Sequence, residues 1–366
     1  MRALHHKNTL TTTKGKADRT LFLLTCILLV AGLIAVADAS APQAQNYFND
    51  SFYYVKQQIL WGGLGFIALV AASNIHYVYW KKISIYLFMA TLVLLVAVLI
   101  PGVGSKVLGA RRWINIGFFG FQPSEVVKLT LALFFARLCE VKKPIGSYLV
   151  FLGITCALIM LQPDLGTTII VLCIGITQLF VSGVSLVQMG ALFGVGGFLG
   201  SLLVFFSSYR RERFMTFLQS SNDPLGSSYH IGQVLIALGS GGLFGKGLGQ
   251  SRQKYLFLPE AATDSVFAII AEEVGFLGSM LLLSLFALFV YKGLRIAMKS
   301  RDPFAAVLAA GIVAWIGGQI FLNLSSMIAL TPLTGVPLPF FSYGGSSLTM
   351  ILLGVGILLN ISKYNE

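Results

Sequence analysis

The chain has 366 residues, of which 56% are hydrophobic and only 11% are charged, and its formal net charge is +12. About a quarter of the residues of a soluble domain are charged, so this composition excludes an ordinary soluble enzyme and indicates an integral membrane protein. The apolar pattern continues without a linker. It predicts a basic cytoplasmic tail over 1–19 and a single all-α polytopic membrane domain over 20–366.

Ten apolar segments follow one another along this domain, and each is long enough to cross roughly 30 Å of hydrocarbon as a helix. They begin near Leu21, Gln58, Ile83, Ser124, Tyr148, Thr167, Leu186, Ser265, Ala305 and Ser346. With both termini in the cytoplasm, roughly 15 of the 26 Lys and Arg residues lie on cytoplasmic segments, as the positive-inside rule expects. The short Lys81–Lys82 and Lys292–Arg301 loops set this orientation. The apolar run Leu21–Ala37 is longer than the core of a signal peptide, which favours an uncleaved first helix.

Two segments predicted to lie outside the membrane are basic, although the positive-inside rule expects Lys and Arg on the cytoplasmic side. They are Lys106–Arg112 and the large extracytoplasmic loop 207–264, between the seventh and eighth spans. The large loop carries Arg210, Lys246, Arg252 and Lys254. Nucleic acid is not expected on this side of the membrane, and the pattern favours an anionic, lipid-linked ligand.

A Trp next to two Arg residues lies between the third and fourth spans. Arg111, Arg112 and Trp113 follow Gly109 and suit a short interfacial element, with the ring at headgroup level and the guanidinium groups reaching phosphate. Simple anchoring at the interface is the alternative.

Two further predicted helices have an acid at or just before their first turn. Pro123 and Glu125 suit the start of the fourth span, and Glu125 and Lys128 share a helix face on which they can pair. An acid and a base within a membrane are expected to point inward, either as a structural ion pair or in a catalytic role. Asp164, in the loop before the sixth span, either caps that helix or adds a polar group to the outer cavity.

The last outer loop, Thr331–Ser347, is too rich in Pro and Gly for a helix and too apolar for a solvated loop. Non-helical backbone at membrane depth is tolerated where it is buried in protein or lines a cavity. We therefore expect a re-entrant wall of the site, carrying Ser342 and Ser346. Asn323, in the preceding span, is expected to face the same interior.

The large loop also contains a glycine-rich run, Gly239–Gly249. It lacks the GxxxxGK[ST] order and the following helix of a nucleotide-binding loop, so nucleotide binding is rejected. Its backbone amides and Lys246 are expected to bind a diphosphate, because glycine allows close approach of the chain and anion-binding nests.

Seven motifs, this run among them, occur in order along the chain. They are Gly109–Ile114 (GARRWI), Phe121–Lys128 (FQPSEVVK), Gln162–Thr167 (QPDLGT), Gly239–Gly249 (GSGGLFGKGLG), Ser251–Glu260 (SRQKYLFLPE), Ala271–Phe276 (AEEVGF) and Gly335–Ser347 (GVPLPFFSYGGSS). Together they resemble the SEDS family (shape, elongation, division and sporulation; FtsW, RodA and SpoVE) over nearly the whole chain. The run Ser251–Glu260 is more similar to the division and sporulation branch than to the elongation branch.

The resemblance implies a peptidoglycan glycosyltransferase of the inner (cytoplasmic) membrane. Such an enzyme polymerises glycan strands from lipid II on the extracytoplasmic face, here in septal wall synthesis during cell division. A lipid II flippase, a RodA-like elongation polymerase and a scaffold without activity are the alternatives. The implied partners are a class B penicillin-binding protein, which supplies the transpeptidase, and other divisome proteins. No metal site is predicted, and a divalent cation (Mg²⁺ or Mn²⁺) at the diphosphate is left open.

The essential acid of the family lies in a Pro-Glu-x-x-Thr-Asp run that maps onto Pro259–Asp264, so the resemblance implies that Asp264 is catalytic. Inversion at the anomeric carbon needs a base for the acceptor hydroxyl and cations for the departing diphosphate. A half-desolvated Asp264 suits the base, and capping of the eighth span is its alternative role. Many members carry His and Phe where this chain has Ala262 and Ser265, so any role of that His is absent or shifted here.

The remaining candidates are polar or cationic side chains near the outer face, and Arg suits phosphate because its planar fork binds two oxygens. The predicted substrate-binding residues are Arg111, Arg112, Trp113, Glu125, Lys128, Asp164, Arg210, Lys246, Arg252, Lys254, Glu260, Ser342 and Ser346. Glu272 and Glu273, one or two turns into the eighth span, are expected to form structural pairs.

Overall fold

The structure of the protein is a computed structural model. It describes residues 15–365, apart from 108, 117–118, 142, 206–210, 212–214, 216–228 and 256. Most of the predicted tail over 1–19, much of the large loop and the predicted ligand Arg210 therefore lie outside the described residues.

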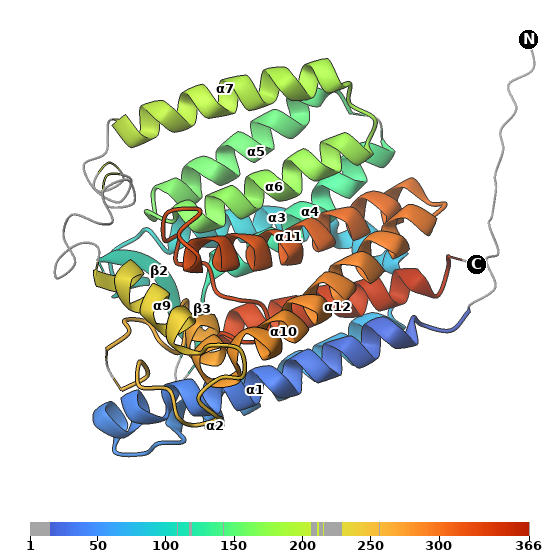
Figure 1. The fold of residues 1–366 in the computed structure, drawn as a ribbon. Coiled ribbons are helices and arrows are strands. Elements are labelled where there is room, and N and C mark those ends of the chain that lie inside the picture. Colours follow the sequence, from blue (N-terminus) through green and yellow to red (C-terminus); the bar gives the residue numbers. More distant parts are fainter. Residues whose placement is uncertain are drawn as a thin grey trace, which may run out of the picture.

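Helices form most of the described chain (Figure 1). They are α1 (Arg19–Phe48), α2 (Tyr53–Asn74), α3 (Tyr77–Ala97), α4 (Pro123–Glu140), α5 (Ile145–Met160), α6 (Leu165–Val181), α7 (Leu186–Phe205), α9 (Tyr229–Ser240), α10 (Val266–Lys299), α11 (Pro303–Met327) and α12 (Gly345–Ser362). Every predicted span begins within or next to one of these helices. Among the described helices, α1–α3 and α10–α12 are long and apolar enough to cross a membrane, and α5 and α6 are apolar but shorter. The chain is a multi-pass membrane protein.

Local sequence sets the start of several helices. Asp18, Asp164 and Asp302 each accept a hydrogen bond from a backbone N–H in the first turn of α1, α6 and α11. Such caps satisfy donors that have no partner within the helix. Pro123 and Pro303 occupy the first helical position, where their missing N–H has no cost.

The prediction of an all-α chain needs one correction. Three strands, β1 (Gly104–Val107), β2 (Ala110–Ile116) and β3 (Phe119–Phe121), form an antiparallel sheet in the order β1-β2-β3. The pairing of β1 with β2 contains a register shift between Ser105 and Lys106, which leaves Arg112 as an extra residue in β2. Such a bulge redirects a side chain, and it does so here at a predicted site residue.

The centre of the bundle is built on α11 and α12. Helix α11 packs against α4, α6 and α10, and α12 packs against α2. Most of α11 is buried, including the whole side chain of Trp315, and its sequence contains no charged residue. In Figure 1, α7 lies at one edge of the bundle beside α5 and α6, far from α1.

Helix α10 is broken at Gly275, whose backbone lies at φ 70° and ψ −169°. The glycine-rich run fills the break. Beyond it, the N–H groups of Phe276 and Leu277 donate to the carbonyls of Gly242 and Leu243, at 2.9 and 3.1 Å. Before it, the carbonyls of Glu272 and Glu273 accept from the N–H groups of Lys246 and Gly247, at 3.1 and 3.0 Å. The run therefore supplies backbone partners on both sides of the break. We call Gly241–Gly247 the glycine clasp.

The glycines of the clasp are explained by close backbone contact. A Cβ on Gly245 would lie 2.0 Å from the carbonyl oxygen of Glu273, and one on Gly241 would lie 2.3 Å from that of Ala271. The amide of Gly245 donates to Gly241, and those of Lys246 and Gly247 donate to α10. These three amides are therefore bonded within the protein, and the diphosphate nest expected over Gly239–Gly249 stays a prediction for other amides of the run.

Replacing Gly275 by Ala should destabilise the protein. The added Cβ would lie 2.2 Å from the amide nitrogen of Gly245, and the backbone conformation is one that essentially only glycine adopts. We expect a loss of roughly 3 kcal/mol or more, seen as a lower unfolding temperature of the purified protein in detergent. Gly239→Ala is the matched control, since its Cβ meets no atom within 4 Å. Equal unfolding temperatures for the two variants would contradict this account of the break.

Candidate active site

Asp264 lies in the turn that leads into α10. The helix N-cap position belongs to Ser265, so Asp264 is not the cap residue that the alternative interpretation required. Its side chain is half-buried, and a Cβ on Gly335 would lie 3.3 Å from its Oδ2. The carboxylate therefore lies against the last loop.

Asn323 ties this turn to the last loop from α11. Its Nδ2 donates to the carbonyl of Asp264 at 2.8 Å and to the carbonyl of Val336 at 2.9 Å. The expectation that Asn323 faces the same interior is confirmed. Its amide fixes the backbone that carries the acid and the backbone that faces it.

The last loop is non-helical from Thr331 to Gly344, as predicted, and its stretch from Leu338 to Ser342 is buried. Ser342 Oγ donates to the carbonyl of Thr263 at 2.5 Å and accepts from the N–H of Leu338 at 2.7 Å. The N–H of Tyr343 donates to the carbonyl of Ala262 at 2.8 Å. Ser342 thus holds the turn before Asp264 and is not placed as a substrate ligand. Ser346, in the first turn of α12, is also buried.

Gln58 is a residue of this wall that the sequence did not identify. Its side chain in α2 donates to the carbonyl of Ser342 and accepts from the N–H of Gly344, both at 3.2 Å. It is fully buried, so its amide binds backbone that water cannot reach. A Gln at the start of an apolar span was the only available signal.

Glu260 shapes the turn before Asp264. Its carbonyl accepts from the N–H groups of Thr263 and Ser265, both at 3.1 Å, and its carboxylate accepts from Thr263 Oγ1 at 2.7 Å. The side chain remains exposed. The contacts assign it to the turn, whereas a direct role in substrate binding has no support from them.

The predicted pair of Glu125 and Lys128 is present in α4. Lys128 Nζ lies 2.7 Å from Glu125 Oε1, and the two side chains are 1% and 4% exposed. Lys128 also lies over the ring of Trp315, 5.6 Å from its centroid. Glu125 Oε2 is buried, and no described residue hydrogen-bonds to it. The inward orientation is confirmed.

Asp164 and Arg112 meet at the start of α6. Asp164 accepts from the N–H and the hydroxyl of Thr167, both at 3.0 Å, so its capping role is confirmed. Arg112 donates through Nε to the carbonyl of Gln162 at 2.9 Å and through Nη2 to that of Pro163. Its Nη1 lies 3.9 Å from Asp164. Arg112 therefore holds the sheet to this turn. Arg111 and Trp113, its neighbours in β2, are half-buried.

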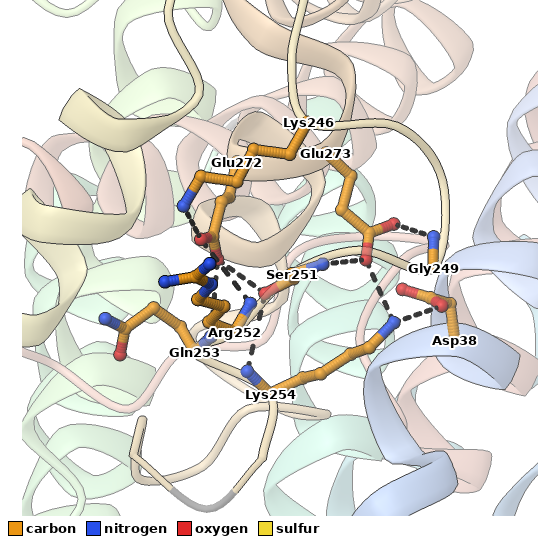
Figure 2. A network of polar contacts seen from close by, with 9 residues as sticks. All are labelled: Asp38, Lys246, Gly249, Ser251, Arg252, Gln253, Lys254, Glu272 and Glu273. Carbon is orange, nitrogen blue, oxygen red and sulfur yellow. Dashed lines mark hydrogen bonds and ion pairs between the residues drawn. The ribbon is translucent and has the colours of Figure 1, made fainter.

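The lysines of the large loop bind the two buried acids of α10 (Figure 2). Lys246 Nζ lies 2.5 Å from Glu272 Oε1, and Lys254 Nζ lies 3.0 Å from Glu273 Oε1 and 2.6 Å from Asp38 of α1. Glu272 and Glu273 are 1% and 4% exposed. The structural pairing expected of these acids is confirmed. Lys246 and Lys254, both predicted as diphosphate ligands, are thus paired with acids in this structure, and their binding of a diphosphate stays a prediction.

Ser251 completes this network. Its hydroxyl donates to Glu272 Oε2 at 2.5 Å, and its N–H donates to Glu273 Oε1 at 2.9 Å. Burial by itself lowers the pKa of Lys254, but its hydrogen bonds to Asp38 and Glu273 outweigh this and hold that pKa above its ordinary value. The ammonium stays charged throughout the neutral range. In contrast, the side chain of Arg252, which lies between Ser251 and Lys254 in the sequence, is exposed.

A family model described as "Cell cycle protein" (FtsW, RodA, SpoVE) matches residues 19–366. The chain belongs to this family. Stage V sporulation protein E of Bacillus subtilis is 44% identical over 98% of this chain and 100% of its own length. A probable peptidoglycan glycosyltransferase FtsW of Haemophilus influenzae is 38% identical over 95% of this chain and 91% of its own.

Solved structures agree with this SEDS assignment. One, described as "Structural coordination of polymerization and crosslinking by a peptidoglycan synthase complex", has a TM-score of 0.80 and 27% identity, covering 95% of this chain and 98% of that chain. The crystal structure of the rod shape determining protein RodA of Thermus thermophilus has a TM-score of 0.71 and 28% identity, covering 94% of this SEDS chain and 96% of its own.

Two other features of the site concern histidine and metals. His230 of α9 lies 2.7 Å, through Nε2, from the hydroxyl of Ser265, next to Asp264. No sequence signal pointed to this contact, because 35 residues separate the partners.

Among the described residues of this SEDS protein, no three His, Cys, Asp or Glu side chains gather closely enough to hold a metal ion.

Lys254→Met should destabilise this SEDS protein strongly. Lys254 is 4% exposed, and its loss leaves two acids without their shared cation. Breaking a buried pair in this way costs about 3–5 kcal/mol, to be measured by thermal or denaturant unfolding in detergent. Arg252→Met is the control, since its exposed side chain should cost less than about 0.5 kcal/mol. A similar effect of both changes would show that the network contributes little.

Proposed function

We propose that this SEDS chain is a peptidoglycan glycosyltransferase that polymerises glycan strands from lipid II, with Asp264 as its general base. Membership of a family whose relatives are named as probable peptidoglycan glycosyltransferases supports the reaction. One observation supports the residue: the acid is held at the start of α10 against the last loop, through Asn323 and Ser342.

The proposed step is an inverting displacement. Asp264 accepts the proton of the acceptor sugar's 4-hydroxyl. At the same time, the oxygen of that hydroxyl forms a bond to C1 of the donor sugar. The bond from C1 to the diphosphate breaks on the opposite face, and the electron pair leaves with undecaprenyl diphosphate. A fixed carboxylate suits this task, because a base must lie within hydrogen-bond reach of the proton that it removes.

The leaving diphosphate needs positive charge. Of the cations predicted for it, Arg252 is exposed and Arg111 is half-buried, so we assign the diphosphate to these two. The buried pair of Glu125 and Lys128 is the candidate for the polar interior of the substrate path, since Glu125 has an oxygen with no hydrogen bond to a described residue. A divalent cation, Mg²⁺ or Mn²⁺, would be bound by the diphosphate itself.

The proposed topology has ten spans, α1–α7 and α10–α12, with both termini in the cytoplasm. Asp264 then lies on the outer face of the inner membrane, where lipid II carries its sugars. The proposed partner is a class B penicillin-binding protein, supported by the match to a synthase complex of polymerisation and crosslinking. Septal or spore wall synthesis is the proposed setting, because a stage V sporulation protein E and an FtsW protein match nearly the whole chain, at 44% and 38% identity.

Asp264→Asn should lower the rate of polymerisation at least about 100-fold, because the amide keeps the shape but cannot accept the proton. Purified full-length variants are mixed with lipid II and a class B partner, and glycan strands are resolved on a gel. Asp50→Asn, at an exposed ion pair between α1 and α2, is the matched control and should leave the rate unchanged. Normal polymer from Asp264→Asn would refute the assigned base. Absence of polymer from the parent protein, with transport of lipid II, would favour a flippase.

Arg252→Ala should raise the lipid II concentration for half-maximal rate roughly tenfold, as expected for loss of one charge-assisted hydrogen bond to phosphate. The unfolding temperature should not change, because the side chain is exposed. Lys56→Ala, another exposed cation, serves as the control. An unchanged half-maximal concentration would remove Arg252 from the site.

A further inference from the structure

His230 reaches the entrance of α10 from another part of the chain. It lies in the first turn of α9, a helix that packs against α10 and α11 (Figure 1). Its Nε2 is 2.7 Å from Ser265 Oγ, and Ser265 is fully buried and directly follows Asp264. The imidazole therefore contacts the residue that directly follows the proposed base in the sequence.

The contact changes what Ser265 does. A serine at an N-cap ordinarily accepts a hydrogen bond from the first turn of its own helix. Ser265 occupies that position in α10 but makes no such bond, and its hydroxyl is bound to His230. The side chain of Ser265 therefore does not cap α10. It links α10 to α9 next to the proposed base.

We propose that His230 is a positioning residue of the polymerase site, which holds Asp264 through Ser265 and makes the orientation of this acid depend on the protonation of the imidazole. The inference rests on the proposed function of Asp264. Neutral imidazole can accept from the hydroxyl of Ser265, whereas imidazolium can only donate to it. Protonation also places a positive charge near Asp264, which favours its carboxylate and weakens it as a base.

Among the described residues on the elements packed against α9, Asp264 is the acid that the proposal concerns, because the other acids have the partners that follow. On α10, Glu272 and Glu273 bind Lys246 and Lys254. Helix α11 has no charged residue and no His in its sequence. In the turn before α10, Glu260 accepts from Thr263. Tyr229 is the other titratable group of α9.

The turn before α10 has no imidazole of its own, because its residues from Glu260 to Ser265 include no His. Ala262 is buried, and its carbonyl accepts from Tyr343. Both Ala262 and Ser265 belong to the same turn, so His230 brings a ring from α9 to the turn that lacks one of its own. His230 can form this hydrogen bond because residue 265 is a serine, whose side chain carries a hydroxyl.

Two substitutions separate hydrogen bonding from titration. The amide of His230→Gln reaches about as far as Nε2 and does not titrate, whereas that of His230→Asn is too short to reach Ser265. The rate of lipid II polymerisation by the full chain with its class B partner is measured from pH 5.5 to 8.5, with kcat and KM separated. Unfolding temperatures are recorded for each variant.

We expect the parent to lose activity toward the acidic end of this range, as the imidazole takes up a proton. His230→Gln should keep kcat at pH 8 within about threefold and lose this acidic limb, whereas His230→Asn should lower kcat roughly tenfold with little change in KM. Ser265→Ala should lower kcat as His230→Asn does, and the double variant should be no worse.

An unchanged pH profile in His230→Gln, together with unchanged kcat in His230→Asn and Ser265→Ala, would overturn the inference. Loss of kcat that His230→Gln does not restore, or that a lower unfolding temperature accounts for, would also overturn it. In each case inactivity of Asp264→Asn would leave the proposed function intact. Activity of Asp264→Asn would reject the base itself, whatever the His230 variants do.

Discussion

The break in α10 at Gly275 is the constraint on which the arrangement around the start of α10 depends. A broken helix leaves backbone N–H and carbonyl groups without partners, and at membrane depth no water replaces them. Here the glycine clasp supplies those partners by direct backbone contact. The contact is possible because Gly241, Gly245 and Gly275 have no side chain at the points where the two segments meet.

The clasp also explains the buried charges. Glu272 and Glu273 directly precede the break, and the loop that fills it brings Lys246 and Lys254 onto them. Lys254 extends the network to Asp38 of α1, so that α1, the large loop and α10 are joined by one set of charges (Figure 2). Such pairs are weak evidence for stability by themselves, because removing charges from water is costly. Their geometry fixes how the large loop lies on the bundle.

This arrangement places the start of α10 where the proposed chemistry needs it. The two turns of α10 before the break are held by the clasp at one end. At the other end Asn323, Ser342 and the backbone of Tyr343 hold the turn that contains Asp264. Because this segment is held at both ends, Asp264 has little orientational freedom left to lose when the reaction begins. A fixed site assists a displacement reaction in this way. His230 adds a further contact to the same turn from α9.

The sequence alone determined the features that depend on near neighbours in the chain. The apolar helices described where spans were predicted follow from segment length and composition, the pair of Glu125 and Lys128 from their spacing, and the cap at Asp164 from the residues beside it. The tertiary structure decided the features that depend on distant segments. It formed the sheet whose bulge turns Arg112 to the start of α6, and it paired Lys254 with Asp38 across 216 residues. It also brought His230 to Ser265. Composition can predict that such polar groups need partners, but only the packing of the helices selects which partners come within reach.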